Sequence, residues 1–145
     1  MKNVKFAALA LFTTAAVSAQ DLSVDQIPTD LSNNFQKAYP NASDVEWEKE
    51  GMNFKVEFDN EKMENEIWYS TEGTMVKSEM EIDENDLPSA ISEMIKSKYP
   101  EYNVDEVDLI NEDGKKMYEI ELEKWFSDDV KLLLTENGEL VKKTE

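Results

Sequence analysis

An internal repeat constrains this chain more than any other feature of its sequence. An apolar and proline pattern recurs 60 residues further on, pairing Ile27-Pro28, Leu31, Phe35 and Tyr39-Pro40 with Leu87-Pro88, Ile91, Ile95 and Tyr99-Pro100. Later residues recur at slightly larger offsets. Phe54, Val56 and Phe58 correspond to Tyr118, Ile120 and Leu122, and Met75-Val76-Lys77 corresponds to Leu140-Val141-Lys142. Self-similarity of this kind indicates one supersecondary unit used twice. We therefore expect two copies of one unit, over about residues 27–82 and 87–145.

Each unit is expected to begin with a helix. Three residues at every fourth position form one apolar stripe, namely Leu31, Phe35 and Tyr39 in the first unit and Ile91, Ile95 and Tyr99 in the second. Pro28 and Pro88 suit the first helical turn, where a missing N–H costs nothing. Pro40 and Pro100 predict where the helices end. The stripe predicts that Phe35, Tyr39, Ile95 and Tyr99 are buried against a sheet.

Four strands are expected to follow each helix. Residues 53–59 and 118–123 alternate between apolar and polar side chains, which is typical of a strand with one buried face. Val45 with Trp47, and Val107 with Leu109, indicate a preceding strand in each unit. Residues 66–70 and 129–135 are predicted third strands, and the glycines at 73 and 138 mark turns into fourth strands.

The predicted fold class is α+β, with two tandem helix–four-strand repeats in two layers. Both helices are expected to cover the apolar face of an antiparallel sheet. The other face would be polar and open. Alternation places seven charged side chains on it: Glu46, Glu48, Lys55, Glu57, Glu119, Glu121 and Glu123.

The N-terminus has the pattern of a secretory signal peptide. Lys2 and Lys5 precede an apolar run over residues 6–17, and Val17-Ser18-Ala19 offers small residues before a cleavage site. The run is about a dozen residues, shorter than the ~20 that a membrane-spanning helix needs. We expect cleavage after about Ala19, a mature chain over residues 20–145, a periplasmic or secreted location, and no insertion into the membrane.

The composition removes several kinds of chemistry. The chain has 15 lysines but no arginine, histidine or cysteine. It therefore has no disulfide, thiolate or imidazole metal ligand, and no Ser–His couple. The formal net charge is −18, and becomes −20 when the two lysines of residues 1–19 are removed. Such a surface repels nucleic acid and favours basic partners or divalent cations, although it also serves simple solubility.

Acidic side chains are so frequent that no carboxylate pair stands out for catalysis. Two acidic segments are candidates for weak calcium association, residues 108–114 and 83–86. If Gly114 took the glycine position of a calcium loop, its first and last ligands would be Leu109 and Ile120, which cannot bind the ion. Residues 111–114 are better explained as a hairpin turn, and residues 83–86 as a linker and helix cap. No metal ligand and no cofactor is assigned.

Large aromatic residues are the candidates for partner binding. Trp68 lies between Ile67 and Tyr69, so alternation turns it toward the open face if these two neighbours are in the core. Exposed aromatic residues are frequent binding anchors, although ordinary sheet packing is the explanation that we prefer for these residues. Trp125-Phe126 lies near a connection between strands. The predicted partner-binding set is Trp68, Glu46, Glu48, Lys55 and Glu57.

The paired helix–Tyr-Pro–strand units resemble the PepSY-like family of beta-lactamase-inhibitor-like proteins. The resemblance covers about residues 27–145 and depends on Tyr39-Pro40 and Tyr99-Pro100, the helix stripes, Trp47 and the alternating strands. It implies an exported bacterial protein with a two-layer α+β fold. The family name implies inhibition, but a fold does not fix a function, and the family pattern supplies no functional residue to transfer.

Two functions remain open from the sequence. The first is an exported, non-enzymatic module that binds a protein or peptide, basic in character, through the open sheet face. The second is an acidic divalent-cation-binding or envelope-stress protein. A hydrolase is a third, weaker hypothesis, because the residues offer no catalytic constellation.

Overall fold

The computed structural model describes residues 20–144, and the predicted signal peptide lies outside them. The first repeat contains α1 (Thr29–Ala38), β2 (Ser43–Glu50), β3 (Asn53–Asn60), β4 (Met63–Tyr69) and β5 (Met75–Glu81). The second contains α2 (Ser89–Lys98), β6 (Asn103–Glu112), β7 (Lys115–Glu123), β8 (Val130–Thr135) and β9 (Leu140–Thr144). A two-residue strand, β1 (Gln20–Asp21), and the 3₁₀ turns η1 (Val24–Gln26) and η2 (Glu84–Asp86) complete the described chain.

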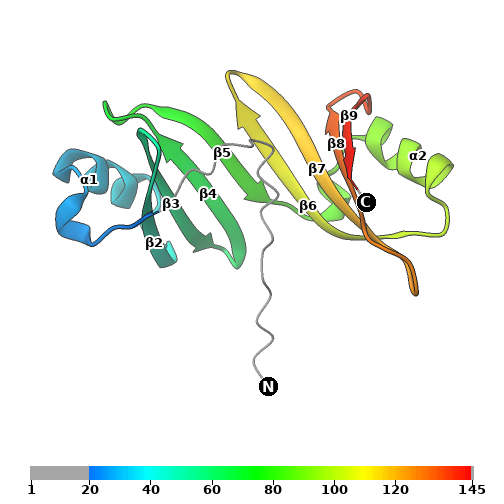
Figure 1. Cartoon of the computed structure of the whole chain (residues 1–145), viewed down its shortest axis with the longest axis horizontal. Coiled ribbons are helices and arrows are strands. Elements are labelled where there is room, and N and C mark those ends of the chain that lie inside the picture. The colour runs from blue at the N-terminus through cyan, green and yellow to red at the C-terminus, as the bar shows by residue number, and fades with distance from the viewer. Residues whose placement is uncertain (1–19, 145) are drawn as a thin grey trace.

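The strands form one sheet in which spatial order follows chain order. All nine described strands are antiparallel neighbours, from β1 at one edge to β9 at the other. The two repeats meet where β5 pairs with β6, from Lys77 opposite Glu112 to Glu81 opposite Asp108. Figure 1 shows the consequence, a continuous sheet with one helix toward each end. The predicted helix–four-strand units are therefore present, and they share a single sheet.

The repeated prolines and tyrosines mark the two ends of each helix. Pro28 and Pro88 are the N-cap residues, so each lies just before its helix and not in the first turn as predicted. The backbone N–H of Tyr39 donates to the carbonyl of Phe35, and the equivalent bond joins Tyr99 to Ile95. Because the next residue in each case is a proline, the helix cannot continue.

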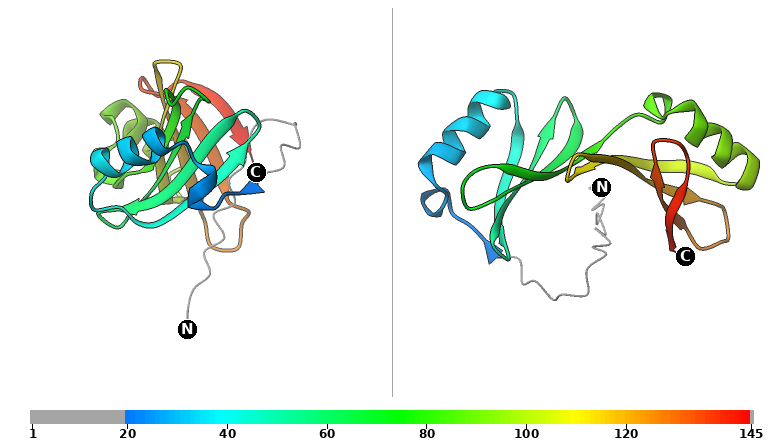
Figure 2. Two further views of the ribbon diagram at one scale, coloured as in Figure 1. Left: turned by 90° about the vertical axis from the view of Figure 1, so that its left-hand side faces the viewer. Right: turned by 90° about the horizontal axis from the view of Figure 1, so that it is seen from above.

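Both helices cover the same face of the sheet (Figure 2). The first core cluster consists of Ile27, Leu31, Phe35, Trp47, Val56, Phe58, Ile67 and Tyr69. The second consists of Leu87, Ile91, Ile95, Val107, Tyr118, Ile120, Leu122, Val130, Leu132 and Leu134. Each large apolar side chain buried in this way contributes about 1.5–3 kcal/mol to folding. The burial predicted for Phe35 and Ile95 is confirmed, whereas Tyr39 and Tyr99 are only partly buried.

Val45 and Trp47 mark the same predicted strand, but Val45 does not share the buried face of Trp47. Val45 is 40% exposed, although Trp47, two residues later, is buried. The pairing of β2 with β3 slips between Ser43 and Glu46, and Asp44 has a left-handed φ of 51°. A β-bulge at this point interrupts the alternation of side chains between the two faces. The alternation that holds from Trp47 onward therefore cannot be extended back to Val45.

Candidate functional site

The sheet face opposite the helices is built mostly from charged side chains. Residues paired across antiparallel strands lie on the same face, so the strand register identifies this surface, here called the open face. Its acids are Asp21, Glu46, Glu48, Glu50, Glu57, Asp59, Glu64, Glu66, Glu79, Glu81, Glu106, Asp108, Glu112, Glu119, Glu121 and Glu123. Its lysines are Lys55, Lys77, Lys115, Lys131 and Lys142. All seven charged residues predicted for this face lie on it.

Trp68 faces the side that the alternation predicted, but it is not exposed. Only 4% of its surface reaches solvent. The ammonium groups of Lys55 and Lys77 lie 5.4 Å and 4.4 Å from its ring, and its indole N–H donates to Glu50. Lysine side chains from both neighbouring strands thus cover the ring. The expectation of an exposed aromatic anchor is wrong, because alternation predicts the face of a residue and not what its neighbours cover.

Lys55 is buried among carboxylates beside this ring. Its ammonium nitrogen lies 2.7 Å from Glu66 Oε1 and 3.3 Å from Glu57 Oε2. Burial by itself lowers the pKa of Lys55, but the charges of Glu66, Glu57 and Glu48 outweigh it and leave the pKa raised. The side chain therefore remains protonated and supplies one positive charge to an otherwise acidic surface.

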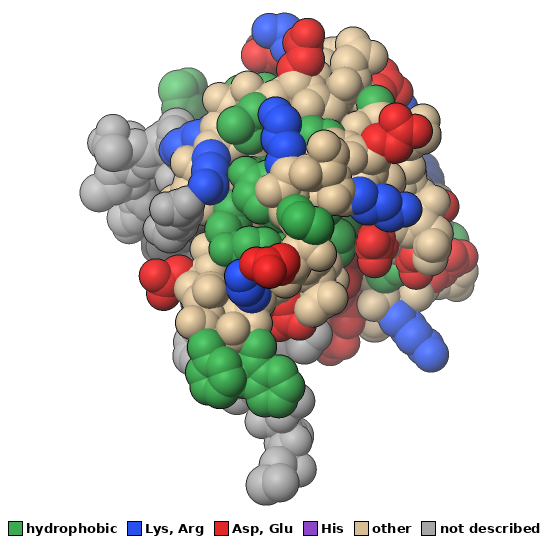
Figure 3. All heavy atoms as spheres, turned by 90° about the vertical axis from the view of Figure 1, so that its right-hand side faces the viewer, with side chains coloured by type: hydrophobic (Ala, Val, Ile, Leu, Met, Phe, Trp, Pro, Cys, Tyr) green, Lys and Arg blue, Asp and Glu red, His purple; other side chains and the backbone are tan. Residues whose placement is uncertain are grey.

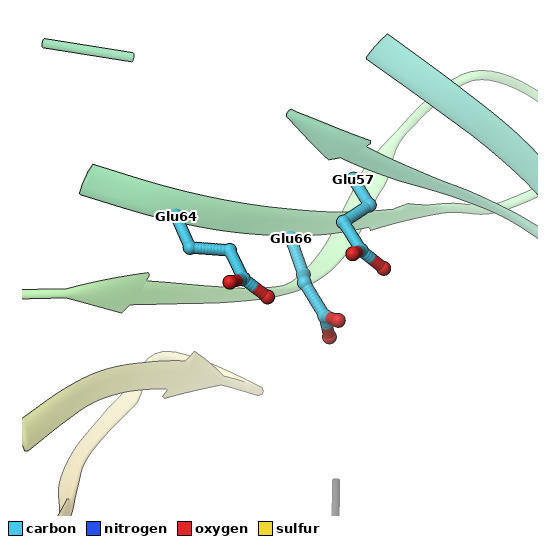
Figure 4. Close-up of side chains that lie close together, drawn as sticks. All are labelled: Glu57, Glu64 and Glu66. Atoms are coloured by element: carbon cyan, nitrogen blue, oxygen red, sulfur yellow. The ribbon is translucent and has the colours of Figure 1, made fainter. Parts of the chain in front are cut away.

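Glu57, Glu64 and Glu66 converge next to Lys55. Each offers a carboxylate oxygen, and the three oxygens lie within 4.8 Å of one another. Figure 4 shows all three side chains projecting from β3 and β4 toward the same side. Burial raises the pKa of Glu66 to about 7 despite the opposing charge of Lys55, and burial together with nearby acids also raises the pKa of Glu64. The negative charge here is greater than one lysine compensates.

A second crowded region lies where the two repeats meet. Burial raises the pKa of Asp108 to about 7, and the charges of Glu106 and Glu79 add to this effect. Burial also raises the pKa values of Glu106 and Glu119. Carboxylates this close to one another are less stable when all are ionised, so the open face as a whole favours the arrival of positive charge.

Of the two acidic segments considered for calcium, residues 111–114 contain the hairpin turn that was preferred, whereas residues 83–86 link β5 to α2 without capping that helix, whose N-cap is Pro88. Asp113 and Gly114 form the turn between β6 and β7, both with positive φ. Asp83 caps η2 by accepting the backbone N–H of Asn85 at 2.9 Å. The cluster of Glu57, Glu64 and Glu66 was missed because it combines two strands and resembles no loop motif. The spacing of Glu64 and Glu66, two residues apart in a strand, was the available signal for a shared face.

The connection between β7 and β8 carries a second surface of a different kind. Trp125 and Phe126 are 86% and 96% exposed, and their rings stack with centroids 5.8 Å apart. This connection extends beyond the sheet at the lower right of Figure 1, and Figure 3 shows hydrophobic side chains projecting from that end of the molecule. These two residues, not Trp68, are the exposed aromatic pair of the described chain.

The sequence and the fold are both similar to known proteins. The family model described as putative beta-lactamase-inhibitor-like, PepSY-like matches residues 2–77 and again residues 55–142. None of the curated proteins matches the sequence. Within the described residues, no helix is long and apolar enough to cross a membrane.

Several crystal structures from Bacteroides have the same fold. A BLIP-like protein from Bacteroides fragilis is 24% identical, with a TM-score of 0.63 over 81% of this chain and 86% of that one. A DUF2874 family protein from Bacteroides uniformis is 17% identical, with a TM-score of 0.69 over 81% and 88%. One described as a putative periplasmic protein, from Bacteroides eggerthii, is 16% identical, with a TM-score of 0.70 over 81% and 87%. With two family matches that together span most of its length, this chain belongs to the PepSY-like, beta-lactamase-inhibitor-like family.

Proposed function

We propose that this chain is an exported, non-catalytic binding protein that holds a basic protein or peptide on its open face. The excess of uncompensated carboxylates on that face is the observation that carries the proposal. Burial raises the pKa values of Glu66 and Asp108, and repulsion from neighbouring acids adds to this effect; a partner rich in lysine or arginine would relieve that repulsion. Both α-helices of the described residues, α1 and α2, lie on the opposite face, so they leave this face accessible to a partner (Figure 2).

Location and chemistry support the same proposal. The N-terminal pattern of residues 1–19 favours export, and one structural relative is described as a putative periplasmic protein. The sequence has no histidine or cysteine, which removes the commonest nucleophile–base pairs. The family name supports inhibition as one form that such binding would take. Electrostatic complementarity would contribute mainly to the rate of association and to the choice of partner.

The structure changes which residues are expected to meet the partner. Trp68 is covered, so it would support Lys55 and Lys77 from beneath and would not enter a partner pocket. Glu46 is exposed, and Glu48 and Glu57 are partly exposed. These three acids of the predicted set are therefore the contact residues that we propose.

The test is a titration with a lysine-rich peptide, comparing two doubly charge-reversed variants. Glu46→Lys with Glu48→Lys changes the open face. Asp30→Lys with Glu93→Lys makes the same change in net charge on exposed positions of the helices. We expect the first variant to bind at least about tenfold more weakly and the second about twofold, because exposed charges are screened beyond roughly 10 Å at 0.1 M salt. Equal weakening would mean that net charge alone attracts the peptide, and the proposed face would be rejected.

A further inference from the structure

We infer that Glu57, Glu64 and Glu66 form a binding site for a divalent cation, and that the ion is calcium, which accepts carboxylate ligands in flexible geometry whereas magnesium keeps most of its water. Oxygen ligands lie 2.3–2.6 Å from Ca²⁺, so ligands on opposite sides of the ion are roughly 5 Å apart. The corresponding separation around Mg²⁺ is only about 4 Å. The three carboxylate oxygens of the cluster lie within 4.8 Å of one another, so all three can bind one calcium ion. Water would complete its coordination.

The burial of Glu66 distinguishes this cluster from an ordinary acidic surface. Glu66 is 7% exposed. Its Oε1 is paired with Lys55, but its Oε2 is buried and accepts no hydrogen bond from any described residue. A buried oxygen without a partner destabilises the folded state. A cation bound among the three carboxylates would satisfy this oxygen.

Lys55 is the internal competitor for the site. Its ammonium group lies against Glu66 and Glu57 in the structure, and a divalent ion would repel it. An alternative position is close by, because the Trp68 ring is 5.4 Å away and Glu48 is the cross-strand neighbour of Lys55. Cation binding would therefore move Lys55 toward Trp68 and Glu48, which gives the site an optical reporter.

The second repeat shows why only one site is expected. Val56 pairs with Ile67 in the first repeat as Ile120 pairs with Leu132 in the second. By the same register, the pair Glu57–Glu66 corresponds to Glu121–Lys131. The ammonium of Lys131 lies 2.9 Å from Glu121. A lysine thus occupies the second-repeat position at which Glu66 stands in the first.

The experiment is a calorimetric titration of EDTA-treated protein with CaCl₂ and, separately, MgCl₂ at physiological ionic strength. We expect one saturable calcium site per chain, with a Kd on the order of 0.1–1 mM as in other extracellular calcium modules, and weaker magnesium binding. Trp fluorescence should change over the same calcium range.

Matched variants assign the site to these residues. Glu64→Gln and Glu66→Gln should each weaken calcium binding at least about tenfold, since each removes a charged ligand. Lys55→Met, which keeps an apolar stem over Trp68, should strengthen it several-fold by removing the competing charge. Glu93→Gln makes the same change of charge on exposed α2 and should leave the Kd unchanged.

Two results would overturn the inference. One is heat that never saturates and is the same in every variant, which is the behaviour of general screening. The other is a saturable site whose Kd stays within twofold in both Glu64→Gln and Glu66→Gln. If Glu66→Gln does not fold, Glu64→Gln and Lys55→Met decide the question. The cation site needs no peptide partner, so its failure and that of the proposed function are separate outcomes.

Discussion

The two repeats share a backbone frame but fill it with different side chains. Five aromatic residues meet around the helix of the first repeat: Phe35, Tyr39, Trp47, Phe58 and Tyr69. The fully buried residues at the centre of the second core are aliphatic: Ile91, Ile120, Leu122, Leu132 and Leu134. The frame therefore requires apolar volume at fixed positions and accepts more than one way of supplying it.

The open faces of the repeats differ in a more consequential way. In the shared register, Lys55, Glu66 and Trp68 of the first repeat correspond to Glu119, Lys131 and Leu133 of the second. Core positions exchange one apolar residue for another, whereas two of these open-face positions reverse their charge, Lys55 to Glu119 and Glu66 to Lys131. Differences in binding between the two halves are therefore expected on the open face, and the cores contribute stability to both.

Truncating each core should produce the largest loss of stability. Phe35 is 3% exposed and contacts the rings of Tyr39, Trp47 and Phe58. We expect Phe35→Ala to cost about 3–5 kcal/mol and Ile95→Ala about 2–5 kcal/mol, measured by urea unfolding. Losses under about 0.5 kcal/mol at both sites would show that the helix faces are assigned wrongly.

Acidification should stabilise the protein through the junction of the repeats. The pKa of Asp108 is raised from 3.8 to about 7, so the unfolded chain loses this proton at lower pH than the folded chain does. The free energy of unfolding should therefore fall as the pH rises from about 4 to 7. The contribution of Asp108 is at most about 4 kcal/mol, and salt reduces it.

Asp108→Asn provides the control for this pH dependence. The amide has nearly the same shape but does not ionise, so the fall in stability between pH 4 and 7 should become smaller. Glu66, Glu64, Glu106 and Glu119 have raised pKa values as well and should preserve part of it. An unchanged slope in Asp108→Asn would mean that Asp108 is ionised at no cost in the folded protein.

Trp68→Ala should lower the free energy of unfolding by about 3 kcal/mol, the low end for a buried tryptophan. The ring is 4% exposed, but flexible lysine side chains cover it and can partly close the space left behind. The corresponding change on the open face of the second repeat, Leu133→Ala, should cost less because Leu133 is only partly buried. Equal losses at the two positions would remove the distinction drawn between the open faces.

The fold could be predicted from the sequence because the repeat and the alternation of apolar and polar residues depend directly on backbone geometry. The helix stripes, the strand pairs and the face of Trp68 all follow from periods of 3.6 and 2 residues. The exposure of Val45 was not predicted, because a β-bulge shifts the alternation of side chains at this point and no residue pattern in the sequence indicates the bulge. Tyr39 and Tyr99, each at the end of its helix, are only partly buried.

For the candidate site, the sequence predicted which types of charged residue lie on the open face but not which of them lie close together. Alternation placed Glu57 and Lys55 on one face, but the convergence of Glu57 with Glu64 and Glu66 depends on the pairing of β3 with β4. The covering of Trp68 depends on Lys77, which reaches it from β5. Contacts between strands require the register, and one sequence gives the register only where both strands have a clear apolar face.

The connections after β3 and β7 give the last contrast between the repeats. In the first, Glu61 and Lys62 form a tight turn, both with positive φ. In the second, the chain from Lys124 to Asp129 forms a longer loop that carries Trp125 and Phe126. Phe126 has a φ of 62°, a conformation that costs a bulky residue roughly 1–2 kcal/mol. The loop therefore exposes two aromatic rings without gaining stability from either.

Replacing this aromatic pair should change stability least of all. We expect the double variant Trp125→Ser, Phe126→Asn to unfold within about 0.5 kcal/mol of the natural chain, as is usual for exposed positions. Any change should be a slight gain, because asparagine tolerates positive φ better than phenylalanine. Urea unfolding beside Trp68→Ala gives the measurement, since both variants remove one tryptophan from the same protein. A loss above about 1 kcal/mol would mean that the pair packs against the fold in solution, and the exposed tip would have to be reassigned to the core of the second repeat.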